Sequence, residues 1–228
     1  MTRTEIIERF RQENPEITAN VVSDANLRSW CLIGDKETCA KARLIVTNGT
    51  IDTVTSQANY DLNSLTNFFD IDENPGGGVS IVDDDGRETR LKKRSKSELD
   101  DLHTSWRTEA SGTPKDYYRR GKYLYLRPAP TSSMDFMNID YVAISDDFND
   151  DNATPFNQLA HLEPFHYALV LYLKMRAKAK VGKPEDAQTA MAEYDGYIKW
   201  IKKEIGGGKY GAISFRPQGI TPYRDTRG

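Results

Sequence analysis

The segment from residue 112 to residue 130 constrains the fold more than any other part of the chain, because its turn residues favour a β-hairpin. Gly121 separates two short runs, and the second run, 122–127, alternates tyrosine with leucine. Pro128 and Pro130 have no backbone N–H to donate to a ladder, so the second strand should end before them. The segment therefore predicts two short strands joined by a tight turn.

Changes in hydrophobic periodicity divide the chain into four parts. Residues 1–46 repeat their apolar positions every three or four residues, which predicts helices, whereas residues 47–145 alternate with a period of two, which predicts roughly five strands. Residues 146–205 return to helical spacing, and residues 206–228 show no periodicity. The expected fold class is α+β: a helical body with a long antiparallel helical hairpin that packs against residues 1–46, a β-rich insertion and an extended C-terminal arm.

The boundaries of the first helices can be predicted from capping residues. Thr4 is expected to cap a short helix that Asn14-Pro15 ends, and Ser23 is expected to start a second helix. Gly34-Asp35 should break the second helix and start another, with helical spacing continuing to about Val46.

Proline and glycine residues predict where the two helices of the helical hairpin begin and end. Pro164 suits the first position of one helix, Gly182 suits its end, and Pro184 suits the first position of the partner helix. Because the connection is very short, the two helices should pack antiparallel. The partner helix has an apolar stripe formed by Ala187, Ala190, Met191, Tyr194, Ile198, Ile201 and Ile205.

Composition excludes several classes of protein. The formal net charge of −3 over 228 residues argues against a polyanion binder driven by bulk electrostatics. Cys31 and Cys39 are too few for a disulfide framework or a four-thiolate zinc site, so we expect buried, reduced thiols. The first ten residues have no signal-peptide core, and the longest apolar run, 167–173, is far shorter than a membrane span, which predicts assembly in the cytoplasm.

The acidic stretch 146–151 partly matches a calcium-binding loop, with Asp147, Asn149 and Asp151 at the first, third and fifth positions. The match then fails, because the glycine and the bidentate glutamate of such loops are replaced by Asn152 and Gln158. A solvated loop is the favoured interpretation, and ion binding is left open. The run 83–85 is likewise interpreted as a turn rather than as a metal site.

Catalytic and cofactor sites are not predicted. His103, His161 and His166 have no accompanying nucleophile motif and are interpreted as core or surface residues. The stretch 206–209 lacks the spacing of a phosphate-binding loop and is interpreted as a hinge. We expect no enzyme activity, no cofactor and no metal.

One dense basic cluster lies on a predicted strand and the loop after it: Arg87, Arg90, Lys92, Lys93, Arg94 and Lys96. A charged, solvated edge strand is the favoured interpretation, and contact with DNA or a partner is the alternative. A group of tyrosines could stack on bases, but alternation favours core packing for at least half of them. This group comprises Tyr117, Tyr118, Tyr123, Tyr125 and Tyr141.

The C-terminal arm contains too many apolar residues for a solubility tail. Its candidate contact residues are Lys209, Tyr210, Ile213, Phe215, Arg216, Pro217, Ile220, Pro222 and Tyr223. Because this segment cannot form a core of its own, we expect it to become ordered on a neighbouring subunit.

The order of these motifs resembles that of the head-to-tail adaptor proteins of tailed phages, also called connector or head-completion proteins. The residues that support the resemblance are Gly112, Pro114, Tyr117 and Tyr118, then Leu126, Pro128 and Pro130, then Ile139 and Tyr141, and finally Pro155 before the hairpin. The whole chain follows this pattern, and its motifs are structural rather than catalytic.

The resemblance implies a structural virion protein at the neck. Such proteins form a ring of identical subunits, usually twelve, beneath the portal protein, where the ring joins the capsid vertex to the tail and lets DNA pass. The expected partners are the portal protein, tail or neck proteins and other copies of the chain. Two alternatives remain: a head-closure or tail-completion protein further from the portal, and a metal-dependent hydrolase that uses His161, His166 and residues 146–151.

Overall fold

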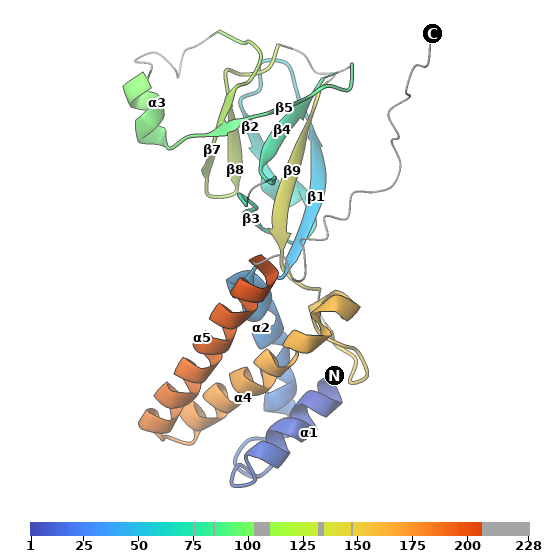
Figure 1. The fold of residues 1–228 in the computed structure, drawn as a ribbon, viewed down its shortest axis with the longest axis vertical. Helices are drawn as coiled ribbons and strands as arrows, with labels where there is room; N and C mark the ends of the chain where they lie inside the picture. Colours follow the sequence, from blue (N-terminus) through green and yellow to red (C-terminus); the bar gives the residue numbers. More distant parts are fainter. Residues whose placement is uncertain (75, 84, 103–109, 132–134, 147, 207–228) are drawn as a thin grey trace.

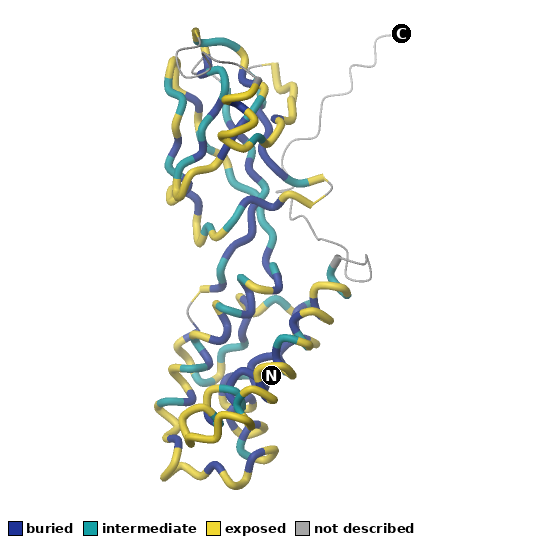
Figure 2. Tube along the Cα trace, turned by 90° about the vertical axis from the view of Figure 1, so that its left-hand side faces the viewer, coloured by how far each residue is buried: buried dark blue, intermediate teal, exposed yellow. Residues whose placement is uncertain are grey.

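The computed structural model describes residues 1–74, 76–83, 85–102, 110–131, 135–146 and 148–206, and it has an α+β fold. The molecule is elongated, with four helices gathered at one end and the strands at the other (Figure 1). A narrow waist separates the two ends, and buried residues run through both of them (Figure 2). Among the described residues, no helix has both the length and the apolar character needed to cross a membrane.

The helical end is built around one central helix. Its four helices are α1 (Arg3–Glu13), α2 (Asp24–Ala42), α4 (Tyr167–Lys180) and α5 (Pro184–Gly206). Helix α4 packs against each of the other three. Its residues 168–173 are all buried, because a helix that is surrounded by others is apolar on most sides.

Helix α1 begins two residues earlier than its capping pattern predicts. Thr2 caps it in a capping box with Glu5, so the expectation that Thr4 is the cap is wrong. The side chain of Thr4 instead donates a hydrogen bond to the backbone of the acidic loop. The predicted end at Asn14 is confirmed.

Helix α2 begins after the predicted cap Ser23 but does not break at Gly34-Asp35. Gly34 is buried against α4, where a Cβ atom would lie 2.6 Å from Cδ1 of Tyr172. The glycine is therefore used for close helix packing rather than for a helix end. The helix ends at Ala42, where Arg43 takes a left-handed conformation with φ 56°, so the expectation of helix to about Val46 is also wrong.

The start of α4 and the apolar stripe of α5 differ from what the sequence predicts. Pro164 lies inside a short 3₁₀ segment, Ala160–Phe165, and α4 begins only at Tyr167 because the His166 N–H bonds to Glu163 three residues back. Helix α5 begins at the predicted Pro184, after a connection of three residues from the end of α4, and the two helices pack together. Met191 is 49% exposed and does not belong to the buried stripe.

The strand β9 (Phe136–Ala143) is the centre of the first sheet. All eight residues of β1 (Ile45–Asp52) pair with it on one side, and β4 (Val79–Val82) and β3 (Phe68–Ile71) share its other side. The sheet is extended at β4 by β5 (Glu88–Arg90) in an antiparallel pair, with Gly86 at φ +77° in the turn between them.

The second sheet has the order β2-β8-β7-β6. Its strands are β2 (Asn59–Asp61), β8 (Tyr123–Arg127), β7 (Asp116–Arg120) and β6 (Lys92–Lys93). The predicted hairpin is confirmed as β7 and β8, with Gly121 at φ +60° in the turn. Only Leu91 separates β5 from β6, so the chain passes directly from one sheet to the other.

The described residues thus contain nine strands rather than roughly five. The expected number was too low because β2, β5 and β6 have only two or three residues each, which is too short for a visible alternation. Core packing of the tyrosines is confirmed for Tyr117, Tyr118 and Tyr141, which are less than 10% exposed. A seven-residue helix, α3 (Lys96–Leu102), follows β6.

Candidate functional site

The acidic loop between β9 and α4 is fastened to the start of α1 by a buried arginine. The side chain of Arg3 is 7% exposed, and its Nε donates to Oδ1 of Asp151 at 2.9 Å. Its two terminal nitrogens donate to the backbone oxygens of Phe148 at 3.0 Å and Asn149 at 2.5 Å. Five donors in a planar fork suit arginine to such a cluster of oxygen acceptors.

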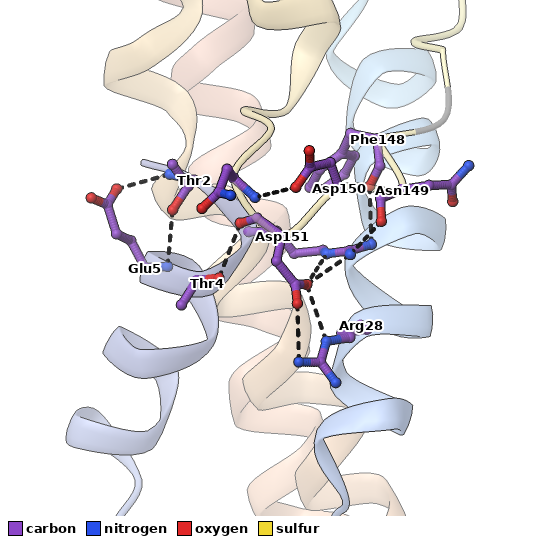
Figure 3. Close-up of polar contacts among 10 residues, drawn as sticks. Thr2, Thr4, Glu5, Arg28, Phe148, Asn149, Asp150 and Asp151 are labelled. Atoms are coloured by element: carbon purple, nitrogen blue, oxygen red, sulfur yellow. Dashed lines mark hydrogen bonds and ion pairs between the residues drawn. The ribbon is translucent and has the colours of Figure 1, made fainter.

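Asp151 also binds α2 and the backbone of α1 (Figure 3). Arg28 approaches its carboxylate with two nitrogens, at 3.1 Å each, in the bidentate geometry that arginine and carboxylate favour. The backbone N–H and the hydroxyl of Thr4 both donate to the backbone oxygen of Asp151, at 3.1 and 3.0 Å. We call Arg3, Arg28, Thr4 and Asp151 the loop clamp, since together they join two helices to the loop.

The loop clamp makes Asp151 a poor ligand for calcium, because two guanidinium groups already face its carboxylate. The neighbouring Asp150 accepts the backbone N–H of Asn152 at 2.9 Å, as in a solvated Asx turn. Asp147 lies outside the described residues. Within the part of the chain that the structure describes, no three His, Cys, Asp or Glu side chains are grouped so that they could hold a metal ion.

Asp151 should make the stability of the protein depend on pH. Hydrogen bonds from Arg28 and Arg3 hold the pKa of its carboxyl below the ordinary 3.8. A carboxyl with a lowered pKa in the folded state stabilises the fold above its unfolded pKa and loses that contribution as the pH falls. We expect Asp151→Asn to lower the unfolding free energy by a constant amount between about pH 5 and about pH 7, where the carboxyl is ionised in both the folded and the unfolded state, and by less below about pH 4.

Urea unfolding of wild type and Asp151→Asn at several pH values measures this difference. As a control, Arg28→Met should lose part of the same stabilisation and show the same fall towards low pH. A difference between wild type and Asp151→Asn that does not change with pH would contradict the ionic role of the carboxylate.

A buried carboxylate on α2 holds the two ends of the same loop. Asp35 is 1% exposed and accepts the backbone N–H of Phe156 at 2.9 Å and the hydroxyl of Ser145. Ser145 follows β9, and Phe156 precedes α4, so Asp35 links the exit from the sheet to the return into the helical end.

The backbone at Phe156 is held in an unusual conformation. Phe156, Asn157 and Gln158 have φ values of 57°, 55° and 57°, three left-handed residues in succession without a glycine. Each such residue costs about 1–2 kcal/mol. The hydrogen bond to Asp35, the complete burial of the Phe156 ring and a bond from the N–H of Asp146 to the Asn157 side chain offset this cost.

His166 and both cysteines are buried. Nδ1 of His166 accepts from the amino group of Met1 at 2.7 Å, and burial together with that positive charge lowers the pKa of the imidazole to about 4. Cys31 and Cys39 are free and buried as predicted, and burial raises the pKa of the Cys31 thiol to about 12 and that of Cys39 further. His161 is half-buried next to α4, and His103 lies outside the described residues.

Three members of the basic cluster lie on edge strands, Arg90 on β5 and Lys92 and Lys93 on β6, because each of these strands is the last of its sheet. Several members form ion pairs within the chain: Arg94 with Asp116 at 3.1 Å, Lys93 with Glu73, and Arg87 with Asp85 at 3.8 Å. Arg90, Lys92 and Lys96 are exposed. The interpretation as charged edge strands is confirmed for Arg90, Lys92 and Lys93. Contact with DNA or a partner stays a prediction.

Sequence reasoning missed the loop clamp and the buried Asp35. Arg3 and Asp151 are 148 residues apart, and no local pattern connects them. Asp35 was assigned to a helix break because Gly-Asp is a common break signal. The candidate arm residues, 209–223, all lie outside the described residues, so their contact role stays a prediction.

Comparison with family models places this α+β chain among the adaptor proteins of phage particles. The matching model is described as SU10 adaptor protein and covers residues 1–207, so the chain belongs to this family. No curated protein matches the chain. The resemblance noted in the sequence is thereby confirmed. Family membership implies a structural role in connecting head and tail, portal and tail proteins as partners, and a place in the virion neck.

Proposed function

We propose that the protein forms a ring of identical copies, twelve in number, beneath the portal, that this ring joins the capsid vertex to the tail, and that DNA passes through its lumen. The main support is the match to the adaptor family over residues 1–207, which includes both the helical end and the sheets. In this ring α4 and α5 would act together as the long antiparallel helical hairpin of the body. Assembly would take place in the host cytoplasm.

The charge of the chain suits a conduit for DNA. A net charge of −3 leaves no bulk attraction that would hold DNA in the lumen. The basic cluster is small, and ion pairs to Asp116 and Glu73 within the chain weaken its field. We propose that its exposed members contact DNA transiently or contact a partner at the edge of the sheets.

Native mass spectrometry of the chain mixed with purified portal protein tests this function. We expect a complex in which a closed ring of copies is bound to one portal ring. Binding to tail proteins but not to the portal would favour the head-closure or tail-completion alternative instead. A metal-dependent hydrolytic activity that is lost in a variant with Asp147→Ala and His166→Ala would contradict the proposal.

We further propose that the arm, residues 209–228, docks onto the portal or a neighbouring copy. Removing the arm should abolish the portal complex, because scattered apolar side chains without a core of their own supply the docking contacts. Thermal unfolding of the shortened chain should stay unchanged, which separates lost docking from misfolding.

A full-length variant tests the same role without shortening the chain. Replacing Phe215, Ile220 and Tyr223 with serine should weaken portal binding as strongly as the deletion does. The matched control replaces Ser214 and Thr221 with alanine and should bind normally. Equal binding by both variants would refute the role of the arm.

A further inference from the structure

An acidic and aromatic surface extends over α1, the start of α4 and the outer side of α5. Its exposed or half-buried members, which we call the acidic face, are Glu5, Glu8, Glu13, Tyr167, Glu193, Tyr197 and Trp200. Its four glutamates outnumber the three cations around them, which are Arg9, Lys174 and the amino group of Met1. Arg9 pairs with Glu13 at 3.0 Å and Lys174 pairs with Glu193 at 2.6 Å. The surface therefore has a net negative charge.

Contacts of aromatic side chains make the acidic face continuous from α1 to α5. The guanidinium of Arg9 lies 4.6 Å from the ring centre of Tyr167. The rings of Tyr167 and Tyr197 are 5.8 Å apart, and those of Tyr197 and Trp200 are 5.0 Å apart. Trp200 remains 42% exposed, which is unusual for so large an apolar side chain.

The acidic face is also hollowed along α1. A shallow depression of about 470 Å³ is lined by Met1, Glu5, Glu8, Arg9, Gln12 and Glu13. The half-buried ring of Tyr167 lies against Arg9 at the edge of this carboxylate-lined depression. Such a site suits a cationic partner, since rings attract cations through their faces. Tryptophan and tyrosine are also enriched where proteins bind each other.

A surface of the opposite charge lies where α2 meets the end of α4. We call Trp30, Ile33, Arg176 and Lys180 the basic face. Both cations lie 5.8 Å from the ring centre of Trp30, and Ile33 is 47% exposed. Arg176 and Lys180 are one helical turn apart, where like charges repel each other.

The other cations of α4 are neutralised within the chain. Lys174 pairs with Glu193, and Lys178 pairs with Glu16 at 2.5 Å. By contrast, neither Arg176 nor Lys180 makes an ion pair within the described residues. An acidic partner would relieve the repulsion between these two cations.

The two faces point in opposite directions from α4. Arg176 follows Tyr167 by nine residues, which is about two and a half helical turns and places the two side chains on opposite sides of the helix. When each copy contacts the next through two different surfaces, the copies form a ring if the rotation from one copy to the next closes. Opposite placement lets each copy use both faces at once.

We propose that the acidic face of one copy binds the basic face of the next. Arg176 and Lys180 then approach Glu8, Tyr197 and Trp200 of the neighbouring copy, where they gain carboxylates and additional ring faces. This contact deepens the proposed ring and rests on it. It assigns the interface between copies to the helical end of the molecule.

Zero-length cross-linking tests this contact in the assembled protein. Copies labelled with ¹⁴N and ¹⁵N are mixed, assembled with purified portal and treated with a carbodiimide, which joins only amines and carboxylates already in contact. We expect linked peptides that contain Lys180 of one isotope and Glu8 or Glu193 of the other. A ring whose cross-links all fall elsewhere would overturn this interface but not the proposed function, whereas the absence of any multimer would overturn both.

Charge reversal gives a second test with a rescue. We expect Arg176→Glu with Lys180→Glu, or Glu8→Lys with Gln12→Lys, to weaken association between copies by about tenfold or more. Mixing the two variants should restore association, because every second interface then joins two reversed faces and the others are unchanged.

The control for these variants reverses charges elsewhere on the helical end. Lys199→Glu with Lys203→Glu has the same spacing on α5 and should leave association unchanged. Circular dichroism confirms that each variant is folded. Failure of the mixture to recover, with both variants folded, would refute the pairing of the two faces.

Discussion

Replacing Gly34 with alanine is expected to destabilise the protein by about 1–3 kcal/mol, although the same change within a helix usually stabilises it by about 1 kcal/mol. The reason is the close contact between α2 and α4. A Cβ atom at Gly34 would lie 2.6 Å from Cδ1 of Tyr172, and the Tyr172 ring is 1% exposed and cannot move aside without disturbing the core. Urea unfolding measures the change.

Gly196 provides the matched control. It also lies within a helix, α5, but beyond its chain neighbours and the nearby helix backbone, no atom of the described residues lies within 4 Å of the Cβ that alanine would add there. Gly196→Ala should therefore stabilise the protein by roughly 0.5–1 kcal/mol. If both substitutions stabilise the protein equally, the packing of α2 on α4 does not depend on the glycine.

Replacing Asp35 with alanine is expected to have the second large effect, a loss of about 3 kcal/mol in unfolding free energy. The substitution removes the acceptor of two buried donors, the Phe156 N–H and the Ser145 hydroxyl, and each unsatisfied donor costs about 1–3 kcal/mol. It also removes support for the left-handed turn at residues 156–158. Hydrogen exchange at the Phe156 amide should accelerate together with the loss of stability.

A surface aspartate separates this effect from the general loss of a negative charge. Asp195 lies 3.7 Å from Lys41 in an exposed pair, and such pairs contribute at most about 1 kcal/mol. Asp195→Ala should therefore change the unfolding free energy much less than Asp35→Ala. Similar losses for the two variants would show that the buried hydrogen bonds of Asp35 contribute little.

The sequence correctly predicted those elements that are determined by interactions between residues close together in the chain. Alternation and a glycine turn predicted the hairpin of β7 and β8, Ser23 predicted the start of α2, and Pro184 predicted the start of α5. In each case the deciding interaction, such as a cap, a fixed φ or a turn, lies within a few residues of sequence.

Predictions failed where a distant contact decided the structure. Gly34 has the sequence signal of a helix break, but the ring of Tyr172 on another helix makes it a packing position. Ile45 fits both helical and strand spacing, and pairing with Ala143 across the sheet makes it a strand residue. The loop clamp depends on Arg3 and Asp151, which only the folded chain brings together.

The ribbon formed by β1 and β9 determines how the molecule would respond to tension between its two ends. Both strands reach the waist, where β1 continues from α2 and β9 leads on towards α4 (Figure 1). Ile45 and Ala143 pair at the waist end of this ladder, so a pull along the long axis would draw both strands in the same direction, and the two backbones would share the force. The helical end and the sheets could therefore be strained in opposite directions without separating.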